Sequence, residues 1–320
     1  MKNIYTVPLT QLVEEAGLSV CYRASDYEKI RITVEDVSRP GLPMAGFFDH
    51  FEPMRLQVMG TVEMSYLDKL SSEGRSIVFD RFFSYKIPAL IIARGNMPHP
   101  ECLEQAQKYD VTILLSSEST SYVVSFLITA LKNHLAPRIT RHGVLVDVYG
   151  EGMLLLGDSG IGKSEAAVEL LKRGHRLIAD DAVEIKKISE TRLVGTAPEL
   201  IRNYLELRGI GVIDIKKLFG MSGVQSRTQI DLVMKFEEWK PGFFYDRLGL
   251  EQDYTQIMGV TVPCVTVPVS AGRNLAGLVE IAVMNNRNKK YGYNSAQEFV
   301  NQVDSHIDTV TKQNKTKNLD

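Results

Sequence analysis

Residues 157–164 read GDSGIGKS and match the phosphate-loop pattern G-x-x-x-x-G-K-[ST]. Glycines let the backbone turn its N–H groups inward, and a helix after the loop would present its positive end to the same point. Lys163 is expected to reach the β and γ phosphates, and the Ser164 hydroxyl to bind Mg²⁺. We predict a nucleoside triphosphate site made of Gly157, Asp158, Ser159, Gly160, Ile161, Gly162, Lys163 and Ser164.

Two adjacent aspartates, Asp180 and Asp181, follow the apolar stretch RLIA shortly after this loop. An apolar strand that ends in aspartate commonly supplies a carboxylate to the metal of a nucleotide site. Successive residues of a strand point to opposite faces, so the two side chains should have different tasks. One is expected to serve the metal and the other to act as general base on the acceptor, although either could instead cap a turn.

His142 precedes the loop by 15 residues and could be brought toward the aspartates. An imidazole beside a carboxylate would tune the carboxylate's proton affinity. A lone histidine is more often structural or exposed, so the residues by themselves leave both interpretations open.

The elements that must position these side chains are two strands, a short helix and a third strand. Residues 144–157 read as a hairpin with a Gly-Glu-Gly turn at 150–152, residues 164–174 as an amphipathic helix that ends at Gly174, and residues 175–188 as one strand. A hairpin before the loop differs from a Rossmann unit, in which a helix connects parallel strands.

The preceding part of the chain predicts a separate α/β domain without a catalytic constellation. Short β-rich runs at 30–34, 56–60, 89–95 and 111–117 alternate with helix-like segments, and residues 117–135 carry apolar residues at helical spacing. We therefore expect an N-terminal α/β domain over 1–132, a linker over 133–141, a catalytic domain over 142–308 and a disordered tail over 309–320.

Length and composition limit the class of protein. The 320 residues are 44% hydrophobic and carry a formal net charge of −2, which favours two folded domains and argues against a nucleic-acid binder. Three widely spaced cysteines suit a reducing cytoplasm rather than a disulfide framework, and no apolar run is long enough to span a bilayer. A cytoplasmic protein is expected.

Residues 193–215, LVGTAPELIRNYLELRGIGVIDI, closely resemble the signature of the HPr kinase/phosphorylase family. The resemblance extends to RPGLPMAGFFDHF and LQVMG in the first domain, and to YDRLGL and VPVSAGRN toward the end. It implies a first domain that resembles a Mur-ligase domain and a second that resembles the nucleotide core of phosphoenolpyruvate carboxykinase.

The same resemblance implies roles for individual residues. The catalytic group would be His142, Lys163, Asp181 and Arg247, and the magnesium ligands would be Ser164 and Glu206. Asp180 stays a further candidate for the metal because it follows the apolar strand. A region that shapes both reactions would comprise Leu205, Glu206, Leu207, Arg208, Gly209, Ile210, Gly211, Val212, Ile213 and Asp214. A region that matters more for dephosphorylation would comprise Pro268, Val269, Ser270, Ala271, Gly272 and Arg273.

The activity implied is bifunctional. Such an enzyme phosphorylates a serine of the phosphocarrier HPr with ATP or pyrophosphate in the presence of Mg²⁺, and it dephosphorylates phosphoserine-HPr with inorganic phosphate, which releases pyrophosphate. The family resemblance also implies a role in carbon catabolite repression, a homohexamer and fructose 1,6-bisphosphate as an effector.

Two other functions remain open at this stage: a small-molecule phosphotransferase related to phosphoenolpyruvate carboxykinase, and a nucleotide-binding regulator without catalysis. A GTPase is disfavoured because NKKY at 288–291 does not supply a guanine-selecting N-K-x-D motif. Residues 271–290 read as a basic amphipathic helix, whose apolar stripe we expect to be core; docking of a protein or anion on its basic side is the alternative.

Overall fold

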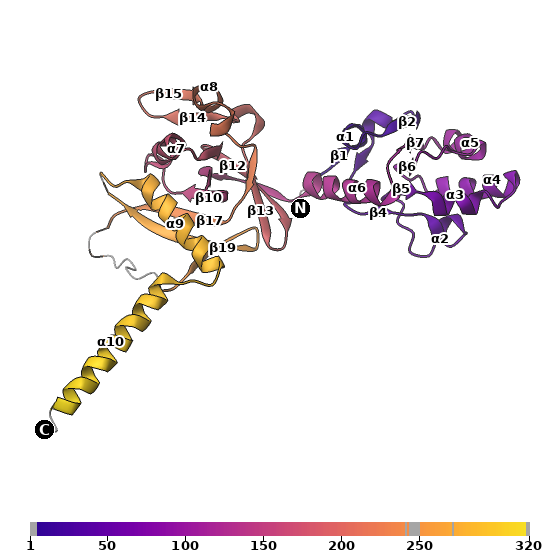
Figure 1. Ribbon diagram of the computed structural model, residues 1–320. Coiled ribbons are helices and arrows are strands. Elements are labelled where there is room, and N and C mark those ends of the chain that lie inside the picture. Colours follow the sequence, from indigo (N-terminus) through magenta and orange to yellow (C-terminus); the bar gives the residue numbers. More distant parts are fainter. Residues whose placement is uncertain (1–4, 241, 243–249, 271, 318–320) are drawn as a thin grey trace. The chain divides into compact units, whose positions relative to one another are not determined.

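The computed structural model describes residues 5–240, 242, 250–270 and 272–317, and it divides the chain into two compact units, residues 1–137 and 138–320 (Figure 1). The division falls between Pro137 and Arg138, inside the expected linker. Residues of that linker belong to regular elements, because α6 continues to Leu135 and β8 begins at Arg138. Each unit has its own sheet and its own apolar core.

The first unit is built on a five-stranded sheet. Its strands, in spatial order, are β2 (Ser19–Tyr22), β7 (Thr112–Leu115), β6 (Ala89–Ile92), β5 (Leu56–Met59) and β4 (Val37–Ser38). Strands β4 to β7 are parallel and β2 is antiparallel to β7, while β1 (Val7–Pro8) pairs separately with β3 (Arg31–Ile32). The strands expected from the β-rich runs are therefore confirmed.

Helices cover both faces of this sheet because its strands are apolar on both sides. Helices α1 (Leu9–Glu15) and α6 (Thr120–Leu135) pack with Val58, Ile91 and Leu114 on one face. The other face packs against α2 (Gly41–Met44), α3 (Thr61–Leu67), α4 (Ser72–Phe83) and α5 (Pro100–Tyr109). A short 3-10 helix, η1, spans Tyr27–Lys29. The α/β class predicted for this unit is confirmed.

The second unit contains two stacked sheets. The larger has the order β11 (Arg176–Ala179), β9 (Val144–Val148), β10 (Glu151–Leu156), β17 (Leu232–Glu238), β19 (Val260–Val269) and β18 (Asp253–Ile257). The smaller consists of β16 (Arg227–Gln229), β13 (Arg192–Thr196), β12 (Ala182–Ser189) and β8 (Arg138–His142). Buried residues of both, among them Leu154, Val183 and Val233, form one core between the sheets.

The opposite face of the larger sheet packs against α7 (Lys163–Lys172) and α9 (Leu275–Lys290). A separate hairpin consists of β14 (Tyr204–Leu207) and β15 (Gly211–Asp214), followed by α8 (Ile215–Phe219). Short 3-10 helices η2 (Glu199–Ile201) and η3 (Met221–Gly223) complete this part, and α10 (Ser295–Lys317) follows α9. The second unit therefore has three layers: the helices α7 and α9, the larger sheet and the smaller sheet.

Local differences from the sequence-based expectations occur around the phosphate loop. The hairpin before it turns at Tyr149 and Gly150, both with positive φ, rather than at 150–152. The segment 175–188 is two strands, β11 and β12, which belong to different sheets. The break comes at Asp181, whose φ of 66° is incompatible with a continuous strand. The two aspartates therefore lie at a turn between sheets.

The end of the chain also differs from the expectation. Helix α10 extends to Lys317, so residues 309–317 of the expected disordered tail are helical. Phe299, Val303 and Ile307, which precede the expected tail, recur at four-residue spacing, and this helical period favours the helix.

Helix α9 buries Ala276, Val279 and Val283 in the core, while Met284 of the expected apolar stripe is exposed. Of its basic residues, Lys290 pairs with Glu151 and Asp231. These contacts favour the structural interpretation of α9 over a docking surface.

Candidate functional site

The predicted phosphate loop connects β10 to α7, with the loop backbone leading into the first turn of the helix. Gly157 has φ 145°, and a Cβ there would lie 2.6 Å from the Phe236 carbonyl oxygen, so only glycine fits. Gly162 precedes Lys163 with φ 104° and is the N-cap of α7. The local arrangement is therefore a glycine-rich turn at a helix N-terminus, which favours anion binding.

Lys163 lies within this loop and is only 6% exposed. Its ammonium donates hydrogen bonds to the carbonyl oxygens of Gly157 and Asp158, each over 2.8 Å. Burial lowers the pKa of Lys163, while Asp180 and Asp158 oppose that shift. The side chain is thus held at the point where a bound phosphate would meet it.

Asp180 is buried at the end of β11 and connects three segments of the site. Its Oδ1 accepts a hydrogen bond from the Ser164 hydroxyl over 2.9 Å, and its Oδ2 accepts one from the Glu206 backbone N–H over 3.0 Å. Burial raises the pKa of Asp180, and the two hydrogen bonds oppose that shift. The carboxylate therefore positions both expected magnesium ligands, Ser164 and the Glu206 segment.

Asp181 and His142 form a pair beside the phosphate loop. The His142 Nδ1 lies 2.9 Å from Asp181 Oδ1 and 2.9 Å from the Asp181 carbonyl oxygen. Both neighbours are acceptors, so Nδ1 carries the proton. Ala182 of β12 pairs with His142 of β8. This pairing places the neighbouring Asp181 next to His142. The Asp181 side chain is 71% exposed, so its carboxylate is open to solvent.

The hairpin β14–β15 adds Glu206 and Arg208 to the same place. The Arg208 Nη2 donates to Ser159 Oγ over 3.1 Å, and a Cβ at Gly160 would lie 2.5 Å from Arg208 Nη1. The guanidinium thus rests directly on the phosphate loop. Sequence reasoning placed Arg208 within the signature but found no signal for this contact, because the two residues are 49 positions apart.

These groups line one cavity of about 120 Å³. Its lining includes His142, Ser159, Lys163, Ser164, Asp180, Asp181, Glu206 and Arg208. The volume is below the roughly 300 Å³ of a site that encloses a small ligand, so it suits a phosphate group while the rest of a nucleotide lies outside. The structure therefore gathers the expected catalytic and magnesium-binding residues, apart from Arg247, around one phosphate-sized space.

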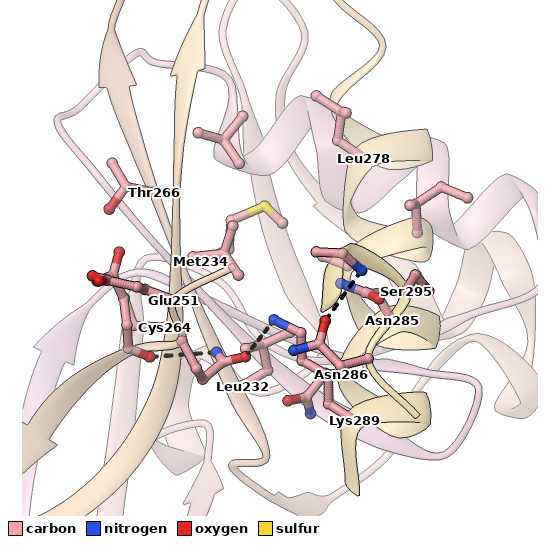
Figure 2. Close-up of a pocket in the computed structure, with 18 of the residues that line it drawn as sticks. Leu232, Met234, Glu251, Cys264, Thr266, Leu278, Asn285, Asn286, Lys289 and Ser295 are labelled. Atoms are coloured by element: carbon pink, nitrogen blue, oxygen red, sulfur yellow. Dashed lines mark hydrogen bonds between the residues drawn. The ribbon is translucent and has the colours of Figure 1, made fainter. Parts of the chain in front are cut away.

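Other expected residues do not line that cavity. Pro268 and Arg273 line a larger groove of about 1070 Å³ beside β17, β19 and α9, whose lining also includes Met234, Asn286 and Lys289 (Figure 2). Arg273 Nη1 donates a hydrogen bond to the Pro268 carbonyl oxygen, so these two residues of the groove contact each other. Arg247 and Ala271 lie outside the described residues.

Comparisons with known proteins identify the family. Models described as HPr Serine kinase N terminus and HPr Serine kinase C-terminal domain match residues 7–131 and 133–303. The chain belongs to the HPr serine kinase family. The family resemblance predicted from residues 193–215 is confirmed, as is the two-domain α/β organisation. Membership of the HPr serine kinase family implies the use of a nucleotide.

Relatives within the HPr serine kinase family match nearly end to end. The HPr kinase/phosphorylase of Thermoanaerobacter sp. (strain X514) is 50% identical over 293 residues, 92% of this chain and 96% of that protein. That of Lachnoclostridium phytofermentans is 48% identical over 304 residues, 95% and 98% of the two chains. The solved structure of the Hpr(Ser) kinase/phosphatase from Coxiella burnetii is 34% identical and covers 50% of this chain and 98% of its own, with a TM-score of 0.45.

No helix in the described part of the chain is both long and apolar enough to cross a membrane. The same described residues contain no cluster of three or more His, Cys, Asp or Glu side chains arranged to hold a metal ion by themselves.

Proposed function

We propose that this chain phosphorylates a serine of the phosphocarrier protein HPr with ATP, and removes that phosphate by phosphorolysis. The single observation that carries the proposal is the Asp181–His142 pair, with 2.9 Å between Oδ1 and Nδ1, in the same cavity as Lys163 and Ser164. A phosphate cradle binds the donor, and an exposed carboxylate beside it can take the proton of a hydroxyl acceptor. The naming of the relatives as HPr kinase/phosphorylase supports HPr as that acceptor.

The donor set at the loop suits a nucleotide with Mg²⁺. Ser164, Asp180 and the Glu206 segment are joined by hydrogen bonds and offer oxygen atoms only. Mg²⁺ prefers oxygen ligands and is usually bound by one or two carboxylates together with substrate phosphates. A bound Mg²⁺ would neutralise charge on the phosphates, and Ser164, Glu206 and Asp180 would hold it.

In the forward direction, the serine oxygen bonds to the γ phosphorus as the bond between that phosphorus and the bridging oxygen breaks, and ADP leaves. Asp181 accepts the serine proton, a contribution of roughly 10² to 10⁴ in rate. Lys163 and Arg208 stand at the loop where negative charge spreads over the transferred group. We assign a similar task to Arg247 by family resemblance alone. Pyrophosphate could replace ATP as donor because the loop would hold the phosphates of either molecule.

In the reverse direction, an oxygen of inorganic phosphate attacks the phosphorus of phosphoserine. The bond from phosphorus to the serine oxygen breaks, Asp181 returns a proton to that oxygen, and pyrophosphate leaves. His142 Nδ1 lies 2.9 Å from Asp181 Oδ1, and a hydrogen bond over this contact would orient the carboxylate toward the serine oxygen.

Further proposals follow from the family rather than from a contact in the structure. They are a homohexamer, a response to fructose 1,6-bisphosphate, a cytoplasmic role in carbon catabolite repression, and a greater importance of residues 268–273 for phosphorolysis. Kinship of the two units with a Mur-ligase domain and with the phosphoenolpyruvate carboxykinase core is also proposed. The hairpin β9–β10 before the phosphate loop supports the second kinship.

Purified HPr tests the proposal directly. The protein is incubated with ATP, Mg²⁺ and HPr, and separately with inorganic phosphate and phosphoserine-HPr, and phosphoserine and pyrophosphate are quantified. HPr with alanine in place of its target serine is the control. Absence of phosphoserine with the unmodified HPr would reject the proposal. ATP consumption without HPr would favour a small-molecule phosphotransferase, and nucleotide binding without any turnover would favour an inactive regulator.

A further inference from the structure

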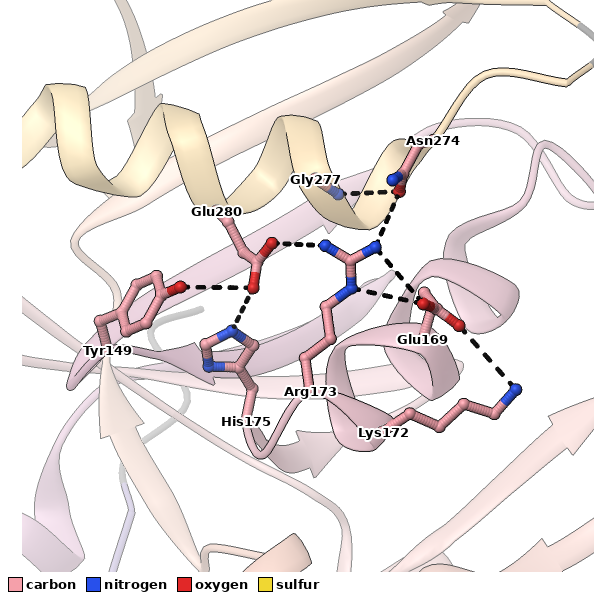
Figure 3. Close-up of polar contacts among 8 residues, drawn as sticks. All are labelled: Tyr149, Glu169, Lys172, Arg173, His175, Asn274, Gly277 and Glu280. Atoms are coloured by element: carbon pink, nitrogen blue, oxygen red, sulfur yellow. Dashed lines mark hydrogen bonds and ion pairs between the residues drawn. The ribbon is translucent and has the colours of Figure 1, made fainter.

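Near the C-terminal end of α7, the carboxylate of Glu280 on α9 contacts both the turn between α7 and β11 and the turn between β9 and β10 (Figure 3). It accepts hydrogen bonds from Arg173 Nη1 over 2.7 Å, from His175 Nε2 over 3.0 Å and from the Tyr149 hydroxyl over 3.4 Å. Arg173 is the C-cap of the phosphate-loop helix α7, and Tyr149 lies in the β9–β10 turn. We call Tyr149, Arg173, His175, Asn274 and Glu280 the Glu280 cluster.

The centre of the cluster, Glu280 and His175, is largely buried, while Tyr149 at its rim is exposed. The side chain of Glu280 is 14% exposed and that of His175 is 6% exposed. Burial raises the pKa of Glu280, but the hydrogen bonds from His175 and Arg173 outweigh burial and leave the pKa below its ordinary value. The carboxylate therefore stays ionised at neutral pH, and the Arg173–Glu280 contact keeps a directional, charge-assisted geometry.

Arg173 also extends the cluster to the start of α9. Its Nη2 lies 3.4 Å from Asn274 Oδ1, and the same Asn274 oxygen accepts the Gly277 N–H over 3.0 Å and so caps the helix. The next residue, Leu275, contacts the phosphate loop, because a Cβ at Gly162 would lie 3.1 Å from Leu275 Cδ1. We use the name 268–274 connection for the described residues 268–270 and 272–274 between β19 and α9. The α9 side of this connection is thus held against α7 and its loop.

The other side of this connection is held by β19 and β17. Val269 accepts a hydrogen bond from the Trp239 N–H over 3.1 Å, and Arg273 Nη1 bonds back to the Pro268 carbonyl oxygen. Residues 268–270 and 272–274 therefore lead from the end of β19, an inner strand of the larger sheet, to a helix that the Glu280 cluster ties to α7. If that tie is loosened, α9 can shift relative to the phosphate loop and carry the connection with it.

We propose that Arg173 and Glu280 are positioning residues that hold the 268–274 connection in register with the phosphate loop, and thereby set the ratio of phosphorolysis to phosphorylation. This inference rests on the proposed function, in which residues 268–273 serve the reverse reaction more than the forward one. Neither side chain lines the phosphate cavity, so they act through the backbone that they hold.

Glu280→Gln tests the proposal because it keeps the shape of the side chain and removes its charge. Glu151→Gln is the matched control. The Glu151 side chain is 12% exposed and contacts Asn286, Arg287 and Lys290 of the same helix α9. It lies at the start of β10, six residues before the phosphate loop begins, which is about 20 Å along a strand.

Both variants are assayed as full-length protein for phosphorylation of HPr and for phosphorolysis of phosphoserine-HPr, with kcat and KM determined separately. Glu280→Gln is expected to lower phosphorolysis kcat/KM at least fivefold more than phosphorylation kcat/KM. Glu151→Gln is expected to leave the ratio within twofold of the unmodified protein. Equal loss of both activities in Glu280→Gln, or the same selective loss in Glu151→Gln, would overturn the proposal. Failure of the unmodified protein to phosphorylate HPr would instead reject the proposed function.

Trp239, the single tryptophan of the chain, gives a readout without substrate. Its backbone bonds to Val269 and its side chain is exposed, so its fluorescence reports on the start of the 268–274 connection. Acrylamide quenching of Trp239 should change in Glu280→Gln and stay unchanged in Glu151→Gln. Unchanged quenching in both variants would show that the Glu280 cluster does not position this connection.

Discussion

The Ser164 hydroxyl donates a hydrogen bond to Asp180 Oδ1 over 2.9 Å, from the first turn of α7 to the end of β11. The bond joins the residue expected to bind Mg²⁺ to a buried carboxylate that also accepts the Glu206 backbone N–H. Asp180 thus supports both proposed magnesium ligands from within the protein, while the Asp181 side chain is left exposed.

Asp180→Asn should make the free protein more resistant to heat while weakening its nucleotide site. Burial raises the pKa of Asp180 above the usual 3.8, so its ionised form costs folding stability. The cost is absent below pH 3.8, grows as the pH rises toward the raised folded-state pKa, and is complete above it. The amide can still accept the Glu206 N–H and can donate to the Ser164 oxygen.

Differential scanning calorimetry checks this prediction. The variant should have an unfolding midpoint equal to or above that of the unmodified protein at pH 7, and the difference should shrink toward pH 4. Affinity for ATP with Mg²⁺, measured by titration calorimetry, should fall at least tenfold because the carboxylate charge is lost. A lower midpoint at pH 7 with unchanged nucleotide affinity would contradict this account of Asp180.

Asp181→Asn should nearly abolish both directions of transfer and preserve nucleotide binding. The amide cannot take the serine proton, and the loss of general base catalysis is expected to be roughly 10² to 10⁴ in kcat. The side chain is 71% exposed, so no large change in stability should accompany this loss. Rapid-quench measurement of phosphoserine on HPr gives the rate, and near-normal phosphorylation would exclude Asp181 as the base.

Arg208→Ala should reduce kcat for phosphorylation by about 10² to 10³, since a positive group at the transferred phosphate stabilises the developing charge. The Arg208 guanidinium contacts Ser159 in the phosphate loop. Lys216→Ala is the control, because Lys216 is an exposed cation on α8 that does not line the cavity. Steady-state kinetics of both variants decide the point: similar effects of the two substitutions would argue for a general effect of surface charge.

Glu101→Gln should weaken the first unit at neutral pH and have less effect in acid. Arg75 holds Glu101 through bonds of 3.0 Å and 2.9 Å between α4 and α5, and this lowers the pKa of Glu101 from 4.5 to about 2. A lowered folded-state pKa contributes stability that is complete above pH 4.5 and lost as the pH falls toward 2.

Hydrogen–deuterium exchange of the α4 and α5 amides, compared with the unmodified protein at each pH, measures this effect. Exchange in the variant should be faster at pH 7, and the difference should be smaller at pH 3. A difference that grows on acidification would have the wrong sign for a carboxylate stabilised in its ionised form.

The sequence by itself determined the phosphate loop, the helix after it and the two domains. These depend on local rules: glycines at 157, 160 and 162, cap residues, and apolar residues at helical or strand spacing. The parallel strands of the first unit were equally predictable, because short apolar runs between helix-like segments favour an α/β sheet.

The tertiary structure alone decided which residues meet. Asp180 and Asp181 were expected to face opposite sides of one strand, but a left-handed backbone at Asp181 ends β11 and sends β12 into another sheet. That turn places Asp181 beside His142, 39 positions away, and leaves Asp180 buried against Ser164.

The contacts of Arg208 with Ser159 and of Glu280 with Arg173 gave no local signal in the sequence. The partners lie 49 and 107 positions apart. Spacing along a chain reveals periodicity and motifs, whereas a contact between distant side chains depends on how the sheets pack. For this protein the sequence therefore determined the loop motif, and packing decided that Asp180 is buried against Ser164 while Asp181 is exposed.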